Sequence, residues 1–535
     1  MNQLLDPPFS YNLWTEPWIS IKTLGGEDET WGIVDVLKKA HLLRSITAVS
    51  PLEIAGIHRF LTAVLQAALS PKDFKDLGDI IGSAKFAPEP IDQFGEEYAN
   101  RFDLFSPERP FFQSGDIPLK PEKGSPVKTV AYLFNEYPSG TGVVHYFHTY
   151  DDSHYICPAC AARGLLIIPA FSSSGGSGIK PSINGVPPIY VLPNCKNLFE
   201  SLAFSLTLPQ FQPTSQTQSI DLPWWKHPED VRKSDEIQEV GYLHSLTFPA
   251  RRVRLFPVKR GRHCTRCGRM SAWGIEQMVF EMGESRPKGS PFWQDPFVAY
   301  SIKEDKEPVP VRPSPGKVIW REYGSLFLKR GNAQADSKIH KTLRPRIIDQ
   351  LDQLQNLTDA DLSTLSFRCI GLRTDMKAKV FEWIDTGFDV PMALLQSDAA
   401  GLDVDDALNF ASECVSILGG ICQDFLNRYK KGSRYIHLKN DLREQLWESF
   451  SQPFRLFILG LLRIQSLPIA QQAAANRDTR LVWDETIVKS SLRLFNELLE
   501  QLGNDGHTLR LRSQVLGGAH RSLYGLLNKE RNNHE

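Results

Sequence analysis

Two pairs of cysteines are the residues of this chain whose types and spacing most clearly predict chemistry. Cys157 and Cys160 form the first pair, and Cys264 and Cys267 form the second, each with two residues between its cysteines. A Cys-x-x-Cys turn directs both thiolates to one point, and two such turns supply the four sulfur ligands of a tetrahedral zinc ion. Two unrelated reduced pairs, or a redox dithiol, would show the same spacing, but two matched pairs favour one zinc ion.

The predicted zinc site is structural rather than catalytic. Four sulfur ligands leave no open coordination position for a substrate or an activated water. Because the two pairs lie far apart in the chain, the ion would join distant parts of one fold and would not make a small separate finger. His154, three residues before the first pair, is an alternative ligand that four cysteines do not require.

The composition is that of an ordinary globular protein. The chain has 535 residues, of which 41% are hydrophobic and 23% charged, enough for two or three domains. The net charge of −1 gives no global field that demands a nucleic-acid partner, so any basic surface must be local. The eight cysteines do not indicate a secreted disulfide framework. No signal peptide or membrane span is evident, and we expect a cytoplasmic protein without membrane contact.

Local positive charge is concentrated just before the second cysteine pair. Lysine and arginine residues are frequent between residues 251 and 269, with no acidic residue among them, and apolar residues interleave as in a strand. Such a run in a neutral chain predicts a phosphate-binding stripe, although a solvated face explains it equally well. The basic residues are Arg251, Arg252, Arg254, Lys259, Arg260, Arg262, Arg266 and Arg269.

The hydrophobic pattern predicts an α+β fold in two domains. Residues 11–35 read as a hairpin, and residues 165–171 as a buried strand. A helix is expected to start at Pro51, with Ser50 as its cap and Glu53 completing a capping box. Four apolar stripes of helical spacing follow further on, over residues 407–425, 442–459, 487–502 and 511–526. Four such helices bury their stripes best as a four-helix bundle, so we predict a mixed domain over 1–390 and a bundle over 391–535.

Catalytic motifs are missing from the sequence. It contains no Gly-x-Ser-x-Gly elbow, no His-Glu-x-x-His, no kinase set, no Walker motif and no deaminase signature. One dense cluster of acid–base groups precedes the first cysteine pair and would suit a hydrolytic metal site, although decoration of a loop is the simpler interpretation. Its members are His145, His148, Asp151, Asp152 and His154. We therefore expect a protein that is not an enzyme.

With these pieces placed, the chain resembles the large subunit of the type I-E CRISPR surveillance complex Cascade, the CasA family. The resemblance rests on the order and spacing of several segments. They are Tyr-Asn-Leu-Trp-Thr-Glu-Pro-Trp-Ile over 11–19, the Ser-Pro-Leu-Glu helix start at residue 50, Arg-Pro-Phe-Phe-Gln over 109–113, both cysteine pairs, the glycine-rich stretch up to Lys180 and the helical C-terminal part.

The resemblance implies a role in prokaryotic antiviral defence. It implies a mixed N-terminal domain with a zinc-type knuckle of four cysteines, a C-terminal four-helix bundle and no catalytic activity. Complexes of this kind recognise a short protospacer-adjacent motif, the PAM, in double-stranded DNA and open the duplex so that guide RNA can pair. The implied partners are the other Cascade subunits, the 5′ end of the guide RNA, the target duplex and the helicase–nuclease that is recruited afterwards.

Three sets of contact residues are implied by the same resemblance. The glycine loop that enters the minor groove at the PAM matches Gly175, Gly176, Ser177 and Gly178, with Lys180 close by. The loop near the 5′ end of the guide RNA matches Tyr146, Phe147, His148 and Thr149. The wedge that splits the first base pairs matches Arg373, Thr374, Asp375 and Met376. A glutamine is common at the wedge tip, where this chain offers Met376, and an apolar tip can still unstack a base step.

Two other functions fit the same residues. The chain could be a stand-alone nucleic-acid-binding protein stapled by zinc, which would bind tightly without guide RNA. It could also be a metal-dependent nuclease that uses the histidine and aspartate cluster, in which case His148→Ala would abolish cleavage.

Overall fold

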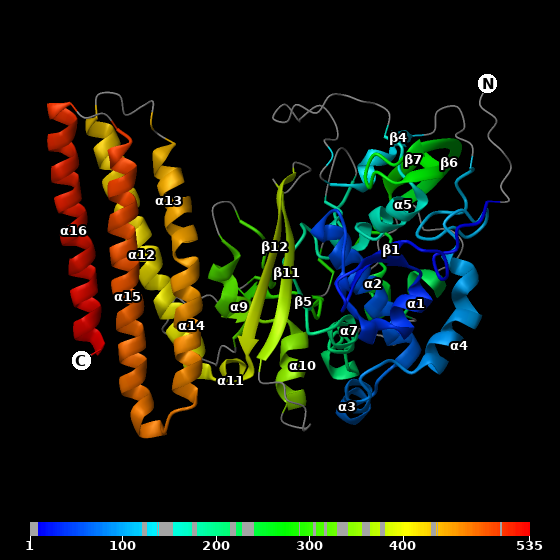
Figure 1. Cartoon of the computed structure of the whole chain (residues 1–535), viewed down its shortest axis with the longest axis horizontal. Coiled ribbons are helices and arrows are strands. Elements are labelled where there is room, and N and C mark those ends of the chain that lie inside the picture. Colours follow the sequence, from blue (N-terminus) through cyan, green and yellow to red (C-terminus); the bar gives the residue numbers. More distant parts are fainter. Residues whose placement is uncertain are drawn as a thin grey trace. The chain divides into compact units, whose positions relative to one another are not determined.

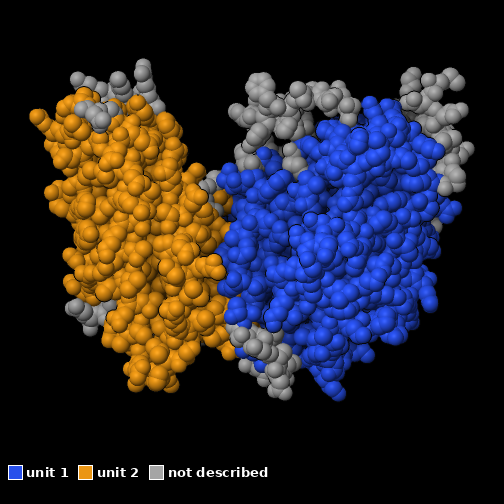
Figure 2. Space-filling view, viewed as in Figure 1, with its two compact units in different colours: residues 1–313, 343–389 blue, residues 314–342, 390–535 orange. Residues whose placement is uncertain are grey.

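The computed structural model describes residues 9–119, 126–135, 137, 154–173, 179–213, 221–226, 240–287, 289–290, 292–302, 306–314, 318–328, 341–355, 364–374, 380–429, 435, 437–502 and 505–534. The chain divides into two compact units (Figure 2). The first unit comprises Met1–Pro313 with Leu343–Asp389, and the second comprises Ser314–Thr342 with Val390–Glu535. The sequence-based division at residue 390 did not place residues 314–342 with the C-terminal helices.

The first unit is built around a buried helix, α2 (Pro51–Leu69). Its residues are buried on every side up to Gln66 except Ile54, because elements of the first unit surround it (Figure 1). Pro51 occupies the first turn as predicted, and Ser50 has extended backbone at the cap position. The Ser50 side chain makes no capping hydrogen bond, so the predicted capping box is wrong. The carboxylate of Glu53 instead contacts Arg163 and Arg266.

Helix α2 is also long and apolar enough to cross a membrane by length and composition. In its most apolar window, 78% of the residues are buried inside the protein. Such burial is typical of a core helix, whose all-round hydrophobicity serves packing.

A small antiparallel sheet opens the first unit. Strands β1 (Ile19–Thr23) and β2 (Asp28–Trp31) form the predicted hairpin, and β3 (Leu43–Ile46) pairs with the other edge of β1. Gly26 lies in the hairpin turn at φ +96°, a conformation that glycine adopts without steric cost. The hairpin prediction is therefore confirmed.

Longer strands carry the features that matter for the site. Strands β6 (Arg251–His263) and β7 (Met270–Met282) form an antiparallel ribbon, and β4 (Val127–Thr129) pairs with β7. A second sheet has the order β12–β11–β5. Its strands are β5 (Tyr190–Pro193), β11 (Thr364–Thr374) and β12 (Val380–Pro391), and the shorter strands elsewhere are β8 (Tyr300–Ile302), β9 (Val309–Pro310) and β10 (Lys341–Leu343).

Short helices fill the rest of the first unit. They are α1 (Ile33–Lys38), α3 (Phe74–Gly82), α4 (Pro88–Tyr98), α5 (Pro158–Leu165), α6 (Ile168–Phe171), α7 (Leu198–Ala203), α8 (Tyr242–Leu246) and α10 (Arg346–Gln355). The strand predicted over 165–171 is wrong, because this run ends α5 and forms α6. A short, wholly apolar run has no period that separates a buried strand from a buried helix.

The second unit consists of long helices. They are α12 (Asp398–Arg428), α13 (Leu438–Ser449), α14 (Ser451–Gln465), α15 (Ile469–Glu500) and α16 (Gly506–His534), preceded by the single turn α11 (Met392–Leu395). All four predicted helical runs are helical. The second run is divided at Phe450 into α13 and α14, and α15 packs against α12, α13, α14 and α16.

A segment from earlier in the chain, Ser314–Thr342, completes the second unit. The segment contains η6 (Ile319–Glu322) and α9 (Tyr323–Phe327). The Trp320 ring lies 5.7 Å from that of Trp447 and 4.7 Å from that of Phe454, measured between centroids. Aromatic contacts across more than a hundred residues of chain therefore assign this segment to the helices, which a local hydrophobic pattern cannot reveal.

Side chains from α15 fix its position along α12. Arg480 Nη2 donates to the Asp406 carbonyl at 2.8 Å, and Trp483 Nε1 donates to the Ala407 carbonyl at 3.1 Å. Arg480 Nε also donates to Asp484 Oδ1 at 3.0 Å, and both side chains are buried. The ion pair lies within α15 and holds the Arg480 guanidinium in place. The hydrogen bonds from Arg480 and Trp483 to carbonyls of α12 then specify how the two helices align.

We predict that Arg480→Met lowers the free energy of unfolding by about 3–5 kcal/mol, because it leaves the buried Asp484 carboxylate without its arginine. Urea unfolding of the full chain measures the change. The exposed pair of Arg493 and Glu497 is the matched control, and Arg493→Met should cost less than about 1 kcal/mol. Adding Asp484→Leu to Arg480→Met should restore most of the loss; a double variant as unstable as the single one would contradict the argument.

Candidate metal centre and nucleic-acid interface

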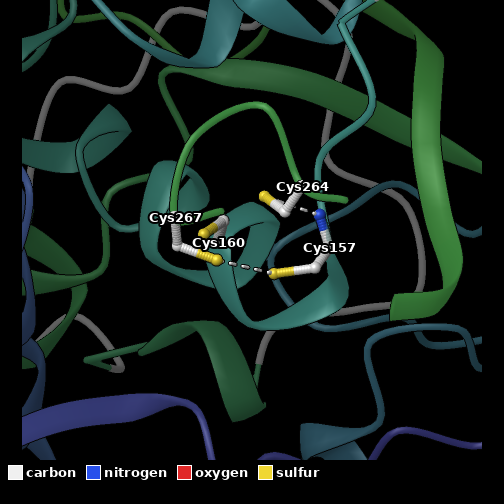
Figure 3. Close-up of side chains that lie close together, drawn as sticks. All are labelled: Cys157, Cys160, Cys264 and Cys267. Carbon is white, nitrogen blue, oxygen red and sulfur yellow. Dashed lines mark hydrogen bonds between the residues drawn. The ribbon is translucent and has the colours of Figure 1, made fainter. Parts of the chain in front are cut away.

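The structure brings the four predicted cysteine ligands together. Cys157 caps α5 and Cys160 lies in its first turn, whereas Cys264 and Cys267 belong to the turn between β6 and β7. All four Sγ atoms lie within 4.8 Å of one another, and Figure 3 shows them facing a common centre. The Cys157 and Cys267 sulfurs are 3.8 Å apart.

A short backbone ladder aligns the two turns. Ile156 N donates to the Ile275 carbonyl at 2.9 Å, and Ile275 N donates back at 2.8 Å. Thr265 N donates to the Tyr155 carbonyl at 2.8 Å. Tyr155 lies against Gly274, where an added Cβ would sit 2.4 Å from its ring. The first cysteine turn is thus paired to the β6–β7 ribbon by main-chain hydrogen bonds immediately beside the sulfurs.

The donor set fits a zinc ion. Zinc–sulfur bonds of about 2.3 Å in a tetrahedron place sulfurs about 3.8 Å apart, which is the Cys157–Cys267 distance. Hydrogen bonding to Cys157 raises the pKa of Cys160, and hydrogen bonding from Cys157 and Cys160 lowers the pKa of Cys267 to about 6. The thiols therefore share protons unequally, and a divalent cation bound among them would hold all four as thiolates.

Three residues with buried side chains next to the sulfurs were not predicted to lie at the metal centre, and one of them, Arg266, had been assigned to the phosphate-binding stripe. Glu53 on α2 is fully buried and contacts Arg163 and Arg266. Arg163 follows Cys160 by three residues, and Arg266 stands inside the second cysteine pair. The sequence held a signal for this, since a carboxylate on the apolar face of a core helix needs a cationic partner.

The predicted basic stripe is wrong for its first three arginines. Arg251, Arg252 and Arg254 are only 4%, 6% and 1% exposed, so they form no surface. Arg252 Nη2 pairs with Asp116 Oδ2 at 2.5 Å, and Arg254 Nη2 donates to the Pro107 carbonyl at 2.9 Å. Burial lowers the pKa of Arg251 and of Arg254 to about 10, which still leaves both charged at neutral pH.

Arg251 ties together the two chain segments that flank the glycine loop. Its Nη2 donates to the Ser173 carbonyl at 2.6 Å, and its Nη1 donates to the Lys180 carbonyl at 2.9 Å. Residues 174–178 between them, which include the predicted Gly175, Gly176, Ser177 and Gly178, lie outside the described residues. The arginine predicted to bind phosphate therefore fixes the separation of the flanks of the loop.

The remaining stripe residues are exposed, except that the Arg266 side chain is 2% exposed and pairs with Glu53. Lys259, Arg260 and Arg262 lie on the part of β6 that leads to the cysteine turn. Lys259 Nζ lies 5.9 Å from the centroid of the Trp273 ring, a cation–π geometry. Glu276 pairs with Arg260 at 3.2 Å and lies 3.8 Å from Arg262, so it offsets part of the local charge.

The other two predicted contact sets are only partly described. Arg373 and Thr374 end β11, and Arg373 Nη1 pairs with Glu382 of β12 at 2.9 Å. The rest of the wedge, Asp375 and Met376, lies outside the described residues. So does the guide-RNA loop of Tyr146, Phe147, His148 and Thr149, together with His145, Asp151 and Asp152 of the histidine and aspartate cluster.

Comparison with known proteins identifies relatives along nearly the whole chain. A family model described as CRISPR-associated protein Cse1 matches residues 12–494. The CRISPR-associated protein CasA/Cse1 of Thermus thermophilus is 29% identical over 430 residues, which cover 77% of each chain. The fold of Cse1 from Acidimicrobium ferrooxidans matches with a TM-score of 0.74 and 21% identity over 99% of this chain and 100% of that one. A chain of a CRISPR RNA-guided surveillance complex matches with a TM-score of 0.67 and 18% identity, over 95% and 100%.

We predict that Gly274→Ala displaces the first cysteine turn from the ribbon, since the new methyl group would overlap the Tyr155 ring. The expected loss is about 1–3 kcal/mol of unfolding free energy, together with faster reaction of the thiols with a disulfide reagent in the metal-free chain. Gly387→Ala on β12 is the matched control, because its nearest neighbour lies 4.0 Å away. Equal stability and equal thiol reactivity in the two variants would show that this contact does not align the turns.

Proposed function

The chain belongs to the Cse1 family of CRISPR-associated proteins, and we propose that it is the PAM-reading subunit of an RNA-guided surveillance complex. The family resemblance predicted from the sequence is confirmed by the match. In the proposed role the chain is not an enzyme. It recognises the PAM in double-stranded DNA, helps to open the duplex for guide RNA and helps to recruit a helicase–nuclease, in the prokaryotic cytoplasm.

The observation that carries this proposal is the extent of the family match. It covers residues 12–494, which contain the cysteine cluster, the glycine loop, the guide-RNA loop and the wedge. A match to an isolated metal-binding module would have covered the cysteine turns alone. The fold of a chain from a CRISPR RNA-guided surveillance complex, matched over its full length, supports assembly with other Cascade subunits.

The glycine loop is the proposed reader of the PAM. Glycine and serine present little more than backbone, which suits a minor groove only about 6 Å wide. Arg251 holds the flanks of the loop together, so the segment between Ser173 and Lys180 leaves and re-enters the fold at fixed points. Fixed ends lower the conformational entropy that a loop loses on binding, which favours DNA contact by this segment.

Exposed basic residues supply phosphate contacts that carry no sequence information. Lys259, Arg260 and Arg262 are the proposed contacts on the ribbon, and Lys180 is exposed beside the glycine loop. The wedge at residues 373–376 would part the first base pairs, and the loop at residues 146–149 would lie near the 5′ end of the guide RNA. Sequence beyond the PAM is left to base pairing with the guide, as in other RNA-guided systems.

The cysteine cluster is the proposed site of one structural zinc ion. Cys157, Cys160, Cys264 and Cys267 would hold it, and its chemistry there is to fix four thiolates in one geometry. We further propose that the second unit acts as a four-helix bundle in which α13 and α14 together form one member. In this architecture, the domain predicted over 1–390 makes the nucleic-acid contacts, and residues 391–535 form the bundle, joined by residues 314–342.

We predict that a guide-loaded complex binds duplex targets tightly and selects their flanking bases only when this chain is present. Binding to a library with randomised flanks, at one stated salt concentration, tests this. Gly176→Asp with Gly178→Asp should weaken binding by roughly tenfold or more, about 1.4 kcal/mol, because carboxylates would face phosphates. Gly82→Asp, at the exposed end of α3, is the matched control.

Three results would contradict the proposed function. Unchanged binding and flank preference without the chain would show that another subunit reads the PAM. Tight binding by the isolated chain, without guide RNA, would favour a stand-alone nucleic-acid-binding protein. Cleavage of DNA by the isolated chain, lost in His148→Ala, would indicate a metal-dependent nuclease.

We predict that Cys264→Ser lowers both the zinc content and the thermal stability of the full chain. Removing one of four ligands weakens the binding of the zinc ion, and zinc binding contributes directly to the free energy of folding in such sites. Metal analysis and melting curves measure the two effects. Cys195→Ser, outside the cluster, should change neither; a zinc-free Cys264→Ser chain as stable as the parent would contradict the structural role.

A further inference from the structure

We propose that Glu53, Arg163 and Arg266 form a buried mount that offsets part of the negative charge of the cysteine centre and ties both of its turns to helix α2. The inference rests on the proposed zinc ion in that centre. It assigns these three residues as positioning residues, which act on the metal through its sulfur ligands.

Arg163 connects the first cysteine turn to the mount. Its Nη2 donates to Cys160 Sγ at 3.1 Å, so the arginine contacts a predicted ligand directly. Its Nε lies 3.8 Å from Glu53 Oε2 and donates to the Ala159 carbonyl at 3.3 Å, while its Nη1 donates to Ser20 Oγ at 2.9 Å. With its side chain 6% exposed, Arg163 is held on all its nitrogens and points one N–H at a sulfur.

Arg266 connects the second cysteine turn to the same carboxylate. Its Nε donates to Glu53 Oε1 at 2.8 Å, and its Nη2 also contacts that oxygen. The guanidinium carbon lies 3.9 Å from the centroid of the Phe134 ring, and the side chain is 2% exposed. A residue between the two cysteines of a pair would ordinarily point to solvent, so its burial against Glu53 requires a reason.

The charge of a zinc tetrathiolate provides that reason. Four thiolates around one divalent cation carry a formal surplus of two negative charges, which is costly to bury without cationic partners. Arg163 and Arg266 supply two positive charges and Glu53 one negative charge, so the three residues together offset one of the two surplus charges. An N–H donated to a thiolate further spreads the charge on sulfur. The Glu53 carboxylate lies between the two guanidinium groups and reduces the repulsion between their charges. It also fixes the orientation of both groups, because one arginine from each cysteine turn contacts one of its oxygens.

The mount explains why a carboxylate lies in the core helix. A plain structural ion pair would need one arginine, and capping of α2 would need an exposed Glu53. Contact with one arginine from each turn instead makes Glu53 a link between two segments more than a hundred residues apart. Partners of this kind around metal ligands typically change metal affinity by roughly 10–100-fold when removed.

The test compares zinc-loaded full-length chains in two measurements. Transfer of zinc to a competing chromogenic chelator gives the rate of release and the apparent affinity, and cobalt substitution gives the sulfur-to-metal charge-transfer band. We expect Arg163→Met and Glu53→Gln to bind zinc roughly 10–100-fold more weakly and Arg163→Met to shift the cobalt band. The zinc affinity of Arg163→Lys should lie between those of Arg163→Met and the parent. If Arg163→Met does not fold, Arg163→Lys is used for the test instead. Arg269→Met is the control, because the Arg269 side chain donates to Thr30 Oγ1 and the substitution leaves the backbone of the cysteine turn unchanged.

The outcomes separate this proposal from the zinc site itself. A parent chain that takes up neither zinc nor cobalt would overturn both. A parent that binds one ion, with Arg163 and Glu53 variants that match its affinity and its cobalt band, would overturn the mount alone. Variants that destabilise the metal-free and metal-loaded chains equally, with unchanged affinity, would assign these residues to packing and would also overturn it.

Discussion

The β6–β7 ribbon is the constraint on which the rest of the site depends. Strand β6 has 13 residues, which span about 40 Å at the usual rise per residue. Arg251 at its start holds the flanks of the glycine loop, and the turn at its end presents Cys264 and Cys267 to the first cysteine pair. One element therefore connects the loop base to the metal centre, with shifts in its pairing to β7 between Phe256 and Pro257 and between Lys259 and Arg262.

Local signals in the sequence predicted a large part of this fold. The Cys-x-x-Cys spacing, the Gly26 hairpin, Pro51 at the start of α2 and the helical stripes beyond residue 400 each depend on neighbouring residues alone. Such features are determined by turn geometry and by the period of apolar residues. These features could therefore be predicted from short stretches of sequence, and the structure confirms that the four cysteines lie together.

The failures share a different physical cause. Glu53 was taken as a capping residue and Arg251 as a phosphate contact, because the sequence shows the charge of a residue and not its partner. The partners are Arg163 and Arg266 for Glu53, and backbone carbonyls of Ser173 and Lys180 for Arg251. The segment with Trp320 was likewise placed in the wrong unit. In each case, a contact between residues far apart in the chain overrides the local pattern.

The burial of arginine also changes how the charge of the protein should be understood. Among the described residues, buried arginines outnumber buried acids, so a run of arginines in the sequence is not by itself evidence of a basic surface. Exposed positive charge on the ribbon comes instead from Lys259, Arg260 and Arg262, and Glu276 partly offsets it. Each phosphate contact contributes about −0.9 to the slope of log affinity against log salt. In the proposed DNA contact, the buried Arg251, Arg252 and Arg254 would therefore add nothing to this slope, whereas the exposed Lys259, Arg260 and Arg262 would contribute to it.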